Sequence, residues 1–274
     1  MQSSDDSARI AEDDEHRSNY VRRLVQGVEW GPFVKTSIKI SIPKVVLQYW
    51  HNLAEIPEDV QSCLDTWESL KNQGYERELF SDDTARAFIS GTLGQRYVLA
   101  FNHCYHPAMR CDYFRLCYIF TNGGFYVDAD ERYQGTDCDC FFFDNKLKLQ
   151  PLCYDTSTGE MINTDTFVRD RKRSQNWIFY FNNNPIIAPP NHPIIDLALE
   201  RATRILLSGV EQPEIQSTTG PGNITASLVR YSSASTNSDK TRDFVILPDW
   251  EATSISPWPL SYRNDQRNWR LWKS

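Results

Sequence analysis

Two aspartates separated by a single residue follow a short apolar run near the middle of the chain. Residues 125–127 read as a buried strand, and Asp128 and Asp130 come directly after it. Because side chains along extended backbone alternate with a period of two, both carboxylates project to the same side. Carboxylates that close repel each other unless they are protonated or bridged by a hard cation such as Mg²⁺ or Mn²⁺. The pattern indicates a site for a metal ion and a diphosphate, although two acids in a solvated turn give the same pattern.

A second pair of charged residues lies in the helical segment before that run. Asp112 and Arg115 are three residues apart, so they share one face of a helix. Their neighbours are mostly apolar or aromatic, which leaves little of this helix free to face water. A partly buried acid and arginine are suited to binding sugar hydroxyls, whereas a surface ion pair is the alternative.

The C-terminal segment joins positive charge to aromatic residues. Between residues 262 and 273 the positive side chains are Arg263, Arg267, Arg270 and Lys273, and the single acidic residue is Asp265. An anionic diphosphate is the natural partner of such a segment. We expect Trp269 to meet the diphosphate or the surroundings of the metal through its indole N–H, with Asn268 or Asp265 nearest the cation. Residues 262–274 then form a lid over the ligand or a docked C-terminal element.

The elements that must position these residues alternate between strands and helices. Apolar or aromatic runs predict strands, and amphipathic spacing predicts helices. The predicted strands cover residues 44–50, 75–80, 125–127 and 177–181, and the predicted helices cover 57–74, 81–89, 96–122 with a break at Pro107, and 193–207. The order indicates an α/β architecture with parallel strands, in which ligands bind beyond the carboxyl ends of the strands.

Composition limits the classes of protein to consider. The chain has 274 residues and a formal net charge of -7, which argues against general nucleic-acid binding. No apolar stretch is long enough to predict a transmembrane segment. Residues 1–17 are acidic and polar, so we expect disorder there and a single domain over 18–274. The missing secretory signal and the odd number of cysteines predict a cytoplasmic protein.

Four stretches resemble a known family. They are IPKVVLQYW at 42–50, AMRCDYFRLCYIFTNGGFYVDADE at 108–131, NNNPIIAPPNHPIIDLAL at 182–199 and TGPGNIT at 219–225. Together they look like the DXD-containing sugar transferases typified by yeast initiation mannosyltransferases. Bacterial capsule and lipooligosaccharide enzymes belong to that family, and the clostridial glucosylating toxins have a similar core. The resemblance implies a GT-A fold with a mostly parallel central sheet flanked by helices, and retaining hexose transfer from a UDP- or GDP-linked sugar.

The resemblance also implies roles for residues near the first part of the site. Asp112 and Arg115 fall on the positions that hold donor-sugar hydroxyls. Asp128 falls on the position that contacts the ribose and the sugar, and Asp130 on the metal ligand. Gly220, Pro221 and Gly222 match a family turn near the acceptor cleft.

Further roles are implied for residues elsewhere in the chain. Gln48 matches a conserved family glutamine, and Trp50 matches an aromatic that can stack on the nucleobase, although a core tryptophan is as good an interpretation. Asn182, Asn183 and Asn184 match a polar segment that faces the reacting sugar, and the pattern does not say which of them points inward.

Departures from the family pattern bear on the source and on the reaction. Leu47 stands where many members have a histidine, and the membrane anchor of the fungal enzymes is missing, which favours a soluble bacterial enzyme. The acceptor, a carbohydrate or another small molecule or glycan, is not readable. Two alternatives stay open: a nucleotide-sugar hydrolase or glycosidase-like enzyme that uses Asp112 and Asp130, and an inactive sugar-nucleotide-binding protein.

Overall fold

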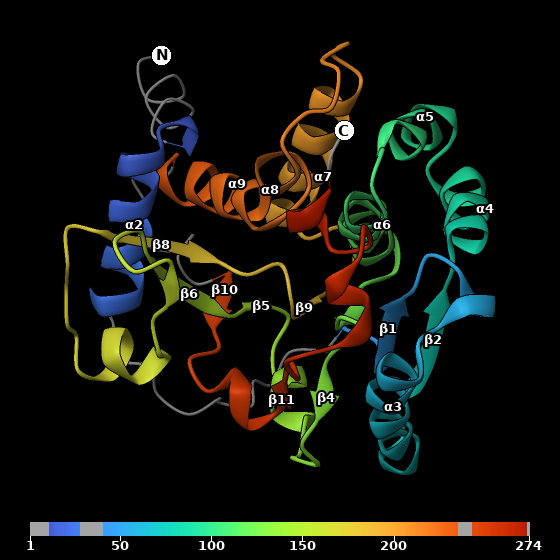
Figure 1. The fold of residues 1–274 in the computed structure, drawn as a ribbon, viewed down its shortest axis with the longest axis horizontal. Helices are drawn as coiled ribbons and strands as arrows, with labels where there is room; N and C mark the ends of the chain where they lie inside the picture. The colour runs from blue at the N-terminus through green and yellow to red at the C-terminus, as the bar shows by residue number, and fades with distance from the viewer. Residues whose placement is uncertain (1–10, 28–40, 235–242, 273–274) are drawn as a thin grey trace.

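The computed structural model describes residues 11–27, 41–234 and 243–272, which form a mixed α/β fold (Figure 1). The helices are α2 (Asp14–Gly27), α3 (Glu58–Thr66), α4 (Asp82–Thr92), α5 (Gln95–His103), α6 (Pro107–Asn122), α7 (Pro193–Leu206), α8 (Ile215–Thr218) and α9 (Pro221–Ser233). The strands are β1 (Val45–Tyr49), β2 (Glu76–Phe80), β3 (Gly124–Tyr126), β4 (Arg132–Tyr133), β5 (Leu147–Leu149), β6 (Pro151–Asp155), β7 (Glu160–Met161), β8 (Trp177–Phe181), β9 (Ile186–Ala188), β10 (Phe244–Ile246) and β11 (Ser254–Ile255).

The central sheet has six strands in the order β10-β5-β9-β3-β1-β2. β1 pairs in parallel with both β2 and β3, and β10 pairs in parallel with β5. Only β9 runs against the others, antiparallel to β3 on one side and to β5 on the other. The predicted α/β class with a mostly parallel sheet between helices is therefore confirmed.

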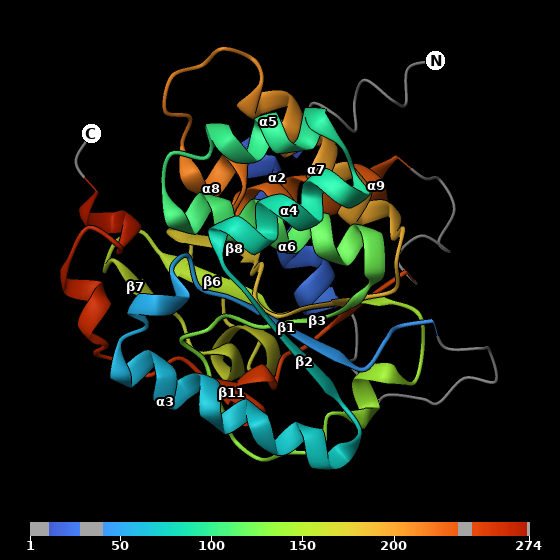
Figure 2. The ribbon, with the colours of Figure 1, turned by 90° about the vertical axis from the view of Figure 1, so that its right-hand side faces the viewer.

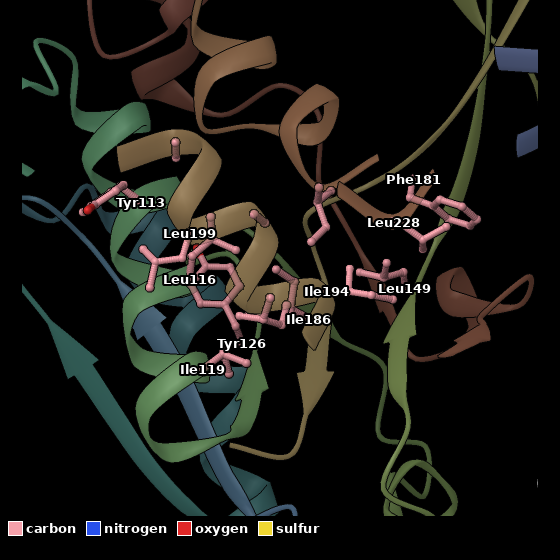
Figure 3. Close-up of a cluster of buried hydrophobic side chains, with 14 of the residues drawn as sticks. Tyr113, Leu116, Ile119, Tyr126, Leu149, Phe181, Ile186, Ile194, Leu199 and Leu228 are labelled. Atoms are coloured by element: carbon pink, nitrogen blue, oxygen red, sulfur yellow. The ribbon is translucent and has the colours of Figure 1, made fainter. Parts of the chain in front are cut away.

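Alternating side chains of the strands build a core on each face of this sheet. Helices α4 to α7 lie over one face and α3 lies over the other (Figure 2). Tyr126 joins the larger apolar cluster with α6 and α7 (Figure 3), whereas its neighbour Phe125 packs edge-on against Trp67 and Trp250. A strand buried on both faces reads as a continuous apolar run, which is why residues 125–127 are recognisable in the sequence.

Two glycines make the turn from α6 into β3 possible. Gly123 has φ +70°, and a Cβ there would lie 2.7 Å from Cδ of Pro190 and 2.9 Å from the carbonyl oxygen of Ala188. Gly124 has φ +120°, and a Cβ there would lie 3.2 Å from the carbonyl oxygen of Val45. The backbone angle disfavours a side chain at both positions, and the space at Gly123 excludes one, so two glycines let the chain leave α6 and enter the sheet at once. This turn places Asp112 and Arg115 of α6 beside Asp128.

Smaller elements surround the central sheet. Strands β7, β6 and β8 form a three-stranded antiparallel sheet, and β11 pairs with β4. Helix α2 packs along β8 and starts at Asp14, before the predicted boundary at residue 18, while residues 1–10 lie outside the described part of the chain. The segment 220–222, expected as a turn, is the start of α9, with Pro221 as its first residue. In the described residues, no helix combines the length and apolar composition needed to cross a bilayer.

Candidate active site

A cleft of about 660 Å³ opens at the carboxyl ends of β1 and β3. Helix α6 and the starts of α8 and α9 contribute to its lining, as do the small antiparallel sheet and the C-terminal strap, by which we mean residues 256–272. Nine of the residues that were expected to bind the sugar, the nucleotide, the diphosphate or the metal line this cleft: Trp50, Asp112, Arg115, Asp128, Asp130, Asn182, Asn183, Asn268 and Trp269. Gln48 and Asp265 are not among the lining residues.

Arg115 is the centre of the polar cluster in the cleft. One of its Nη atoms lies 2.9 Å from an oxygen of Asp112 and 2.9 Å from Oδ1 of Asp128. The other Nη donates to the backbone carbonyl of Asn183 at 2.6 Å, and the guanidinium stacks 4.0 Å above the ring of Tyr126. The side chains of Arg115 and Asp112 are only 4% and 11% exposed, so the surface ion pair considered above is the wrong interpretation.

Asp112 is enclosed by polar groups from two other segments. Asn183 donates its Nδ2 to Oδ1 of Asp112 at 2.8 Å, and the hydroxyl of Thr219 lies 3.4 Å from Oδ2. A Cβ on Gly220 would lie 3.3 Å from the same Oδ2, so a small residue is required at this contact. Burial raises the pKa of Asp112 to about 6, although the positive charge of Arg115 acts against it.

The three asparagines before β9 have different hydrogen-bond partners. Asn183 holds Asp112, and Asn182 donates to the side chain of Gln150 at 3.1 Å. Asn184, the third asparagine of the predicted polar segment, accepts the backbone N–H of Asp128 at 3.0 Å and donates to Oε1 of Glu131 at 3.1 Å. Asn184 therefore fixes the backbone of the D-x-D segment, while Asn182 and Asn183 line the cleft.

The two carboxylates of the D-x-D segment are held by different parts of the molecule. Oδ1 of Asp128 accepts the hydroxyl of Tyr126 at 2.6 Å and Nη2 of Arg115 at 2.9 Å, both from the core around β3 and α6. Oδ2 of Asp130 accepts the hydroxyl of Tyr262 at 2.6 Å and Nη2 of Arg263 at 2.6 Å, both from the C-terminal strap. The positive charge of this segment is evident in the sequence, but its contact with Asp130 was not predicted.

The expected metal ligands of the strap are occupied by the strap itself. Asp265 pairs with Arg267 at 2.6 Å. Asn268 donates its Nδ2 to the carbonyl of Arg263 at 2.7 Å and accepts the N–H of Arg270 at 3.1 Å. The ring of Trp269 lies 4.6 Å from the guanidinium of Arg270. Asp265 and Asn268 thus have partners within the strap, and among the described residues neither has a hydrogen bond to Asp128 or Asp130.

The D-x-D carboxylates fit a divalent cation in their donor chemistry. Among the described residues, Oδ2 of Asp128 and Oδ1 of Asp130 accept no hydrogen bond, so each carboxylate keeps one open oxygen. The described part of the chain has no group of three or more His, Cys, Asp or Glu residues that could hold a metal. Mg²⁺ is commonly held by one or two carboxylates and substrate phosphates, so two oxygens are sufficient for that arrangement.

Trp50 and Gln48 differ in their access to the cleft. Trp50 is mostly buried, packs edge-on against Tyr262 at 5.4 Å, and its indole N–H has no partner among the described residues. An unpaired buried donor at the edge of a cleft is suited to a polar ligand. Gln48 is fully buried and does not line the cleft: its Oε1 accepts Nε of Arg77 at 2.8 Å, and its Nε2 has no partner among the described residues.

Comparisons with known proteins find a distant likeness among solved structures. No protein-family model matches the chain, and the curated proteins contain no match. Among solved structures, the PaToxG glycosyltransferase is similar to this chain, with 15% sequence identity and a TM-score of 0.48. The match covers 88% of this chain and 93% of that one. A likeness this distant assigns no function, so the function rests on the residues of the cleft.

Proposed function

We propose that this chain is a GT-A glycosyltransferase that moves a hexose from a UDP- or GDP-linked sugar to an acceptor, with retention of configuration and a divalent cation at the D-x-D segment. The observation that carries this proposal is the buried Asp112–Arg115–Asp128 cluster at the carboxyl ends of two parallel strands. Charged groups held this firmly at the base of a cleft are suited to a polar, hydroxyl-rich ligand. Ligands of open α/β sheets bind at this edge.

The proposed roles follow from the positions of the side chains. Asp112, Arg115 and Asn183 form the polar wall that would bind hydroxyls of the donor sugar. Asp112 accepts hydrogen bonds in its ionised form, and Arg115 only donates. Asn182, which lines the cleft beside them, would bind the same ligand. Trp50, which lines the cleft, would contact the nucleobase.

The D-x-D carboxylates would hold the cation through Oδ2 of Asp128 and Oδ1 of Asp130. A bound Mn²⁺ or Mg²⁺ supplies positive charge that stabilises the diphosphate leaving group. Arg263 and Arg270 of the strap line the same cleft and would add to this charge. We include residues 262–274 in the proposal as a lid on a single domain that spans residues 18–274, with Trp269 at the diphosphate.

Release of UDP or GDP from a panel of nucleotide sugars tests the proposal. The protein is incubated with each donor in Mn²⁺ and then in EDTA. We expect release with one class of donor in Mn²⁺ and its loss in EDTA. Asp130→Ala should lose this activity. Asp83→Ala should keep it, because Asp83 is an exposed aspartate on α4 that pairs only with Arg86 among the described residues.

The acceptor decides between transfer and hydrolysis. A mixture of candidate carbohydrate and small-molecule acceptors is added, and the sugar is followed by mass spectrometry. A glycosylated product supports the transferase. Free sugar as the sole product in every mixture would instead favour a nucleotide-sugar hydrolase. Binding of a nucleotide sugar without release of UDP or GDP would favour an inactive binding protein.

A further inference from the structure

Each carboxylate of the D-x-D segment already has a positive partner within the protein. Asp128 pairs with Arg115 at 2.9 Å, and Asp130 pairs with Arg263 at 2.6 Å. A divalent cation held by the open oxygens, Oδ2 of Asp128 and Oδ1 of Asp130, would still lie within a few ångströms of both guanidinium groups, because each guanidinium pairs with the other oxygen of the same carboxylate. Like charges at that distance repel, most strongly where water is excluded. One of the two arginines therefore opposes the cation unless it moves away.

Arg115 is the less mobile of the two arginines. It belongs to α6, is 4% exposed, and is tied to Asp112, Asp128 and the carbonyl of Asn183. Removing its guanidinium from the cluster would leave Asp112 buried without its positive partner, which is strongly destabilising. Because this cost is high, we do not expect a cation to bind by displacing Arg115.

Arg263 is attached to the site through the C-terminal strap. Its side chain is 13% exposed, and its guanidinium lies 4.2 Å above the ring of Trp258, which is itself 66% exposed. It donates to the hydroxyl of Ser256 at 2.8 Å, and its buried Nε has no acceptor among the described residues. These contacts, apart from Asp130, come from the strap, so Arg263 can leave Asp130 without opening the core.

The other arginines of the strap do not have this position. Arg267 pairs with Asp265, two residues away, and Arg270 lies over the ring of Trp269. Neither has a hydrogen bond to a D-x-D carboxylate among the described residues. Arg263 and Arg267 therefore carry the same charge in the same segment, and they differ in their contact with Asp130.

We propose that Arg263 is a built-in counter-cation of the D-x-D segment, and that a divalent cation binds there by displacing its guanidinium from Asp130. The inference rests on the proposed metal site and adds a competitor to it. The affinity for the metal is then set partly by the strap. An anionic diphosphate in the cleft would favour the displacement, because it offers the released guanidinium a new partner.

Binding of Mn²⁺ alone, without donor, tests the competition. Free Mn²⁺ is measured by electron paramagnetic resonance during titration of the wild type and of Arg263→Gln, Arg267→Gln and Asp130→Asn. We expect Arg263→Gln to bind Mn²⁺ about tenfold more tightly than the wild type, within the range of ordinary coupling between two sites. Arg267→Gln, the charge-matched control, should change the affinity by less than about twofold, because salt screens a charge that does not contact the site.

Asp130→Asn and Trp258→Ala complete the experiment. The Asp130→Asn variant should bind Mn²⁺ more weakly than the wild type. The double variant with Asp130→Asn and Arg263→Gln should bind Mn²⁺ no more tightly than Asp130→Asn alone. Trp258→Ala keeps Arg263 but removes the exposed ring beneath it, so a gain of about threefold is expected, since exposed cation–π contacts are modest. This variant also serves if Arg263→Gln loses its fold.

Three results would overturn the inference. The first is equal affinity of Arg263→Gln and the wild type, and the second is an equal gain in Arg263→Gln and Arg267→Gln. The third is no Mn²⁺ binding by any of the variants, which would remove the metal site as well. The test is separate from that of the proposed function, because a tenfold gain in Mn²⁺ affinity needs no donor. If the protein released no UDP or GDP, the proposed transferase activity would be wrong, but a tenfold gain in Mn²⁺ affinity would still support the competition by Arg263.

Discussion

Replacing Glu131 with glutamine should remove part of the pH dependence of folding stability. Glu131 follows the D-x-D segment and is 7% exposed. Oε1 accepts Nδ2 of Asn184 at 3.1 Å, and Oε2 accepts the hydroxyl of Ser254 at 2.5 Å. Burial raises the pKa of Glu131 to about 8, and the negative charges of Asp130 and Asp128 act in the same direction, against the hydrogen bond from Ser254.

The size and sign of the effect follow from linkage between protonation and folding. Between the ordinary pKa of 4.5 and the folded value of about 8, folded Glu131 keeps a proton that the unfolded chain releases. The contribution of Glu131 to folding stability is fully present below pH 4.5, and it is lost as the pH rises through about 8. Since a pKa difference of one is worth about 1.4 kcal/mol, the loss comes to about 5 kcal/mol.

Urea unfolding followed by circular dichroism, at pH values from about 5 to about 8.5, measures this loss. Glu131→Gln keeps an uncharged side chain of the same shape, and its amide can donate to Ser254, whose hydroxyl also lies 3.3 Å from the carbonyl of Arg132. The free energy of unfolding of the variant should equal that of the wild type near pH 5 and exceed it by several kcal/mol near pH 8.5. The exposed Glu160→Gln is the control and should follow the wild type. Parallel curves for Glu131→Gln and the wild type would refute the reasoning.

Three more predictions concern the cluster and the strap. Arg115→Ala should lower the free energy of unfolding by about 3–5 kcal/mol in urea titrations, because Asp112 loses its partner in a buried place; an unchanged titration would contradict the pairing. Turnover of the donor should fall below about pH 6 as Asp112 becomes protonated, and Asn183→Ala should move this fall to higher pH, since it removes a hydrogen bond to the ionised form. Deleting residues 262–274 should abolish transfer with the circular dichroism spectrum retained, and donor with Mn²⁺ should protect the segment of the full chain from proteolysis; transfer at the full rate by the truncated chain would disprove the lid.

Elements with strong local signals were predicted close to their observed bounds. The strand at 44–50 is β1, and the helix at 57–74 is α3 followed by a 3₁₀-helix, Trp67–Gln73, that ends at Gly74 with φ +80°. The predicted helix end at residue 122 agrees with the end of α6, because Gly123 and Gly124 after an apolar helix are a local stop signal. Each of these features depends on residues close together in the sequence.

Elements whose structure depends on distant partners were missed. β5, β9 and β10 have three residues each, too few for a periodic pattern, and they exist because they pair with one another and with β3. Residues 220–222 form a typical turn sequence, yet proline also favours the first position of a helix, and here it begins α9. Local composition did not distinguish these two outcomes.

In the site, too, contacts within one segment could be predicted from the sequence, whereas a contact between distant segments could not. Asp112, Arg115 and Asp128 were found together because a helix, a glycine turn and a short strand fix their relative positions within one segment. The partner of Asp130 could not be found in this way, since Arg263 is separated from it by 133 residues. A basic tail predicts attraction to some acidic group, but several acidic groups are available, and charge alone does not select one.

The two carboxylates of the D-x-D segment are held by different parts of the molecule, Asp128 by the core and Asp130 by the strap. Asp128 is fixed on three sides by the core, through Tyr126, Arg115 and the amide of Asn184. The hydrogen-bond partners of Asp130 belong to the strap, which is anchored to the rest of the molecule by bonds from Ser261 to Asp59 and from His106 to the carbonyl of Gln266. Asp128 is therefore pre-organised whatever the strap does, whereas the charge that Asp130 presents changes whenever Arg263 moves. If a cation binds between them, the strap controls only one of its two protein ligands, so strap mutations should alter cation affinity without disturbing the Asp112–Arg115–Asp128 cluster.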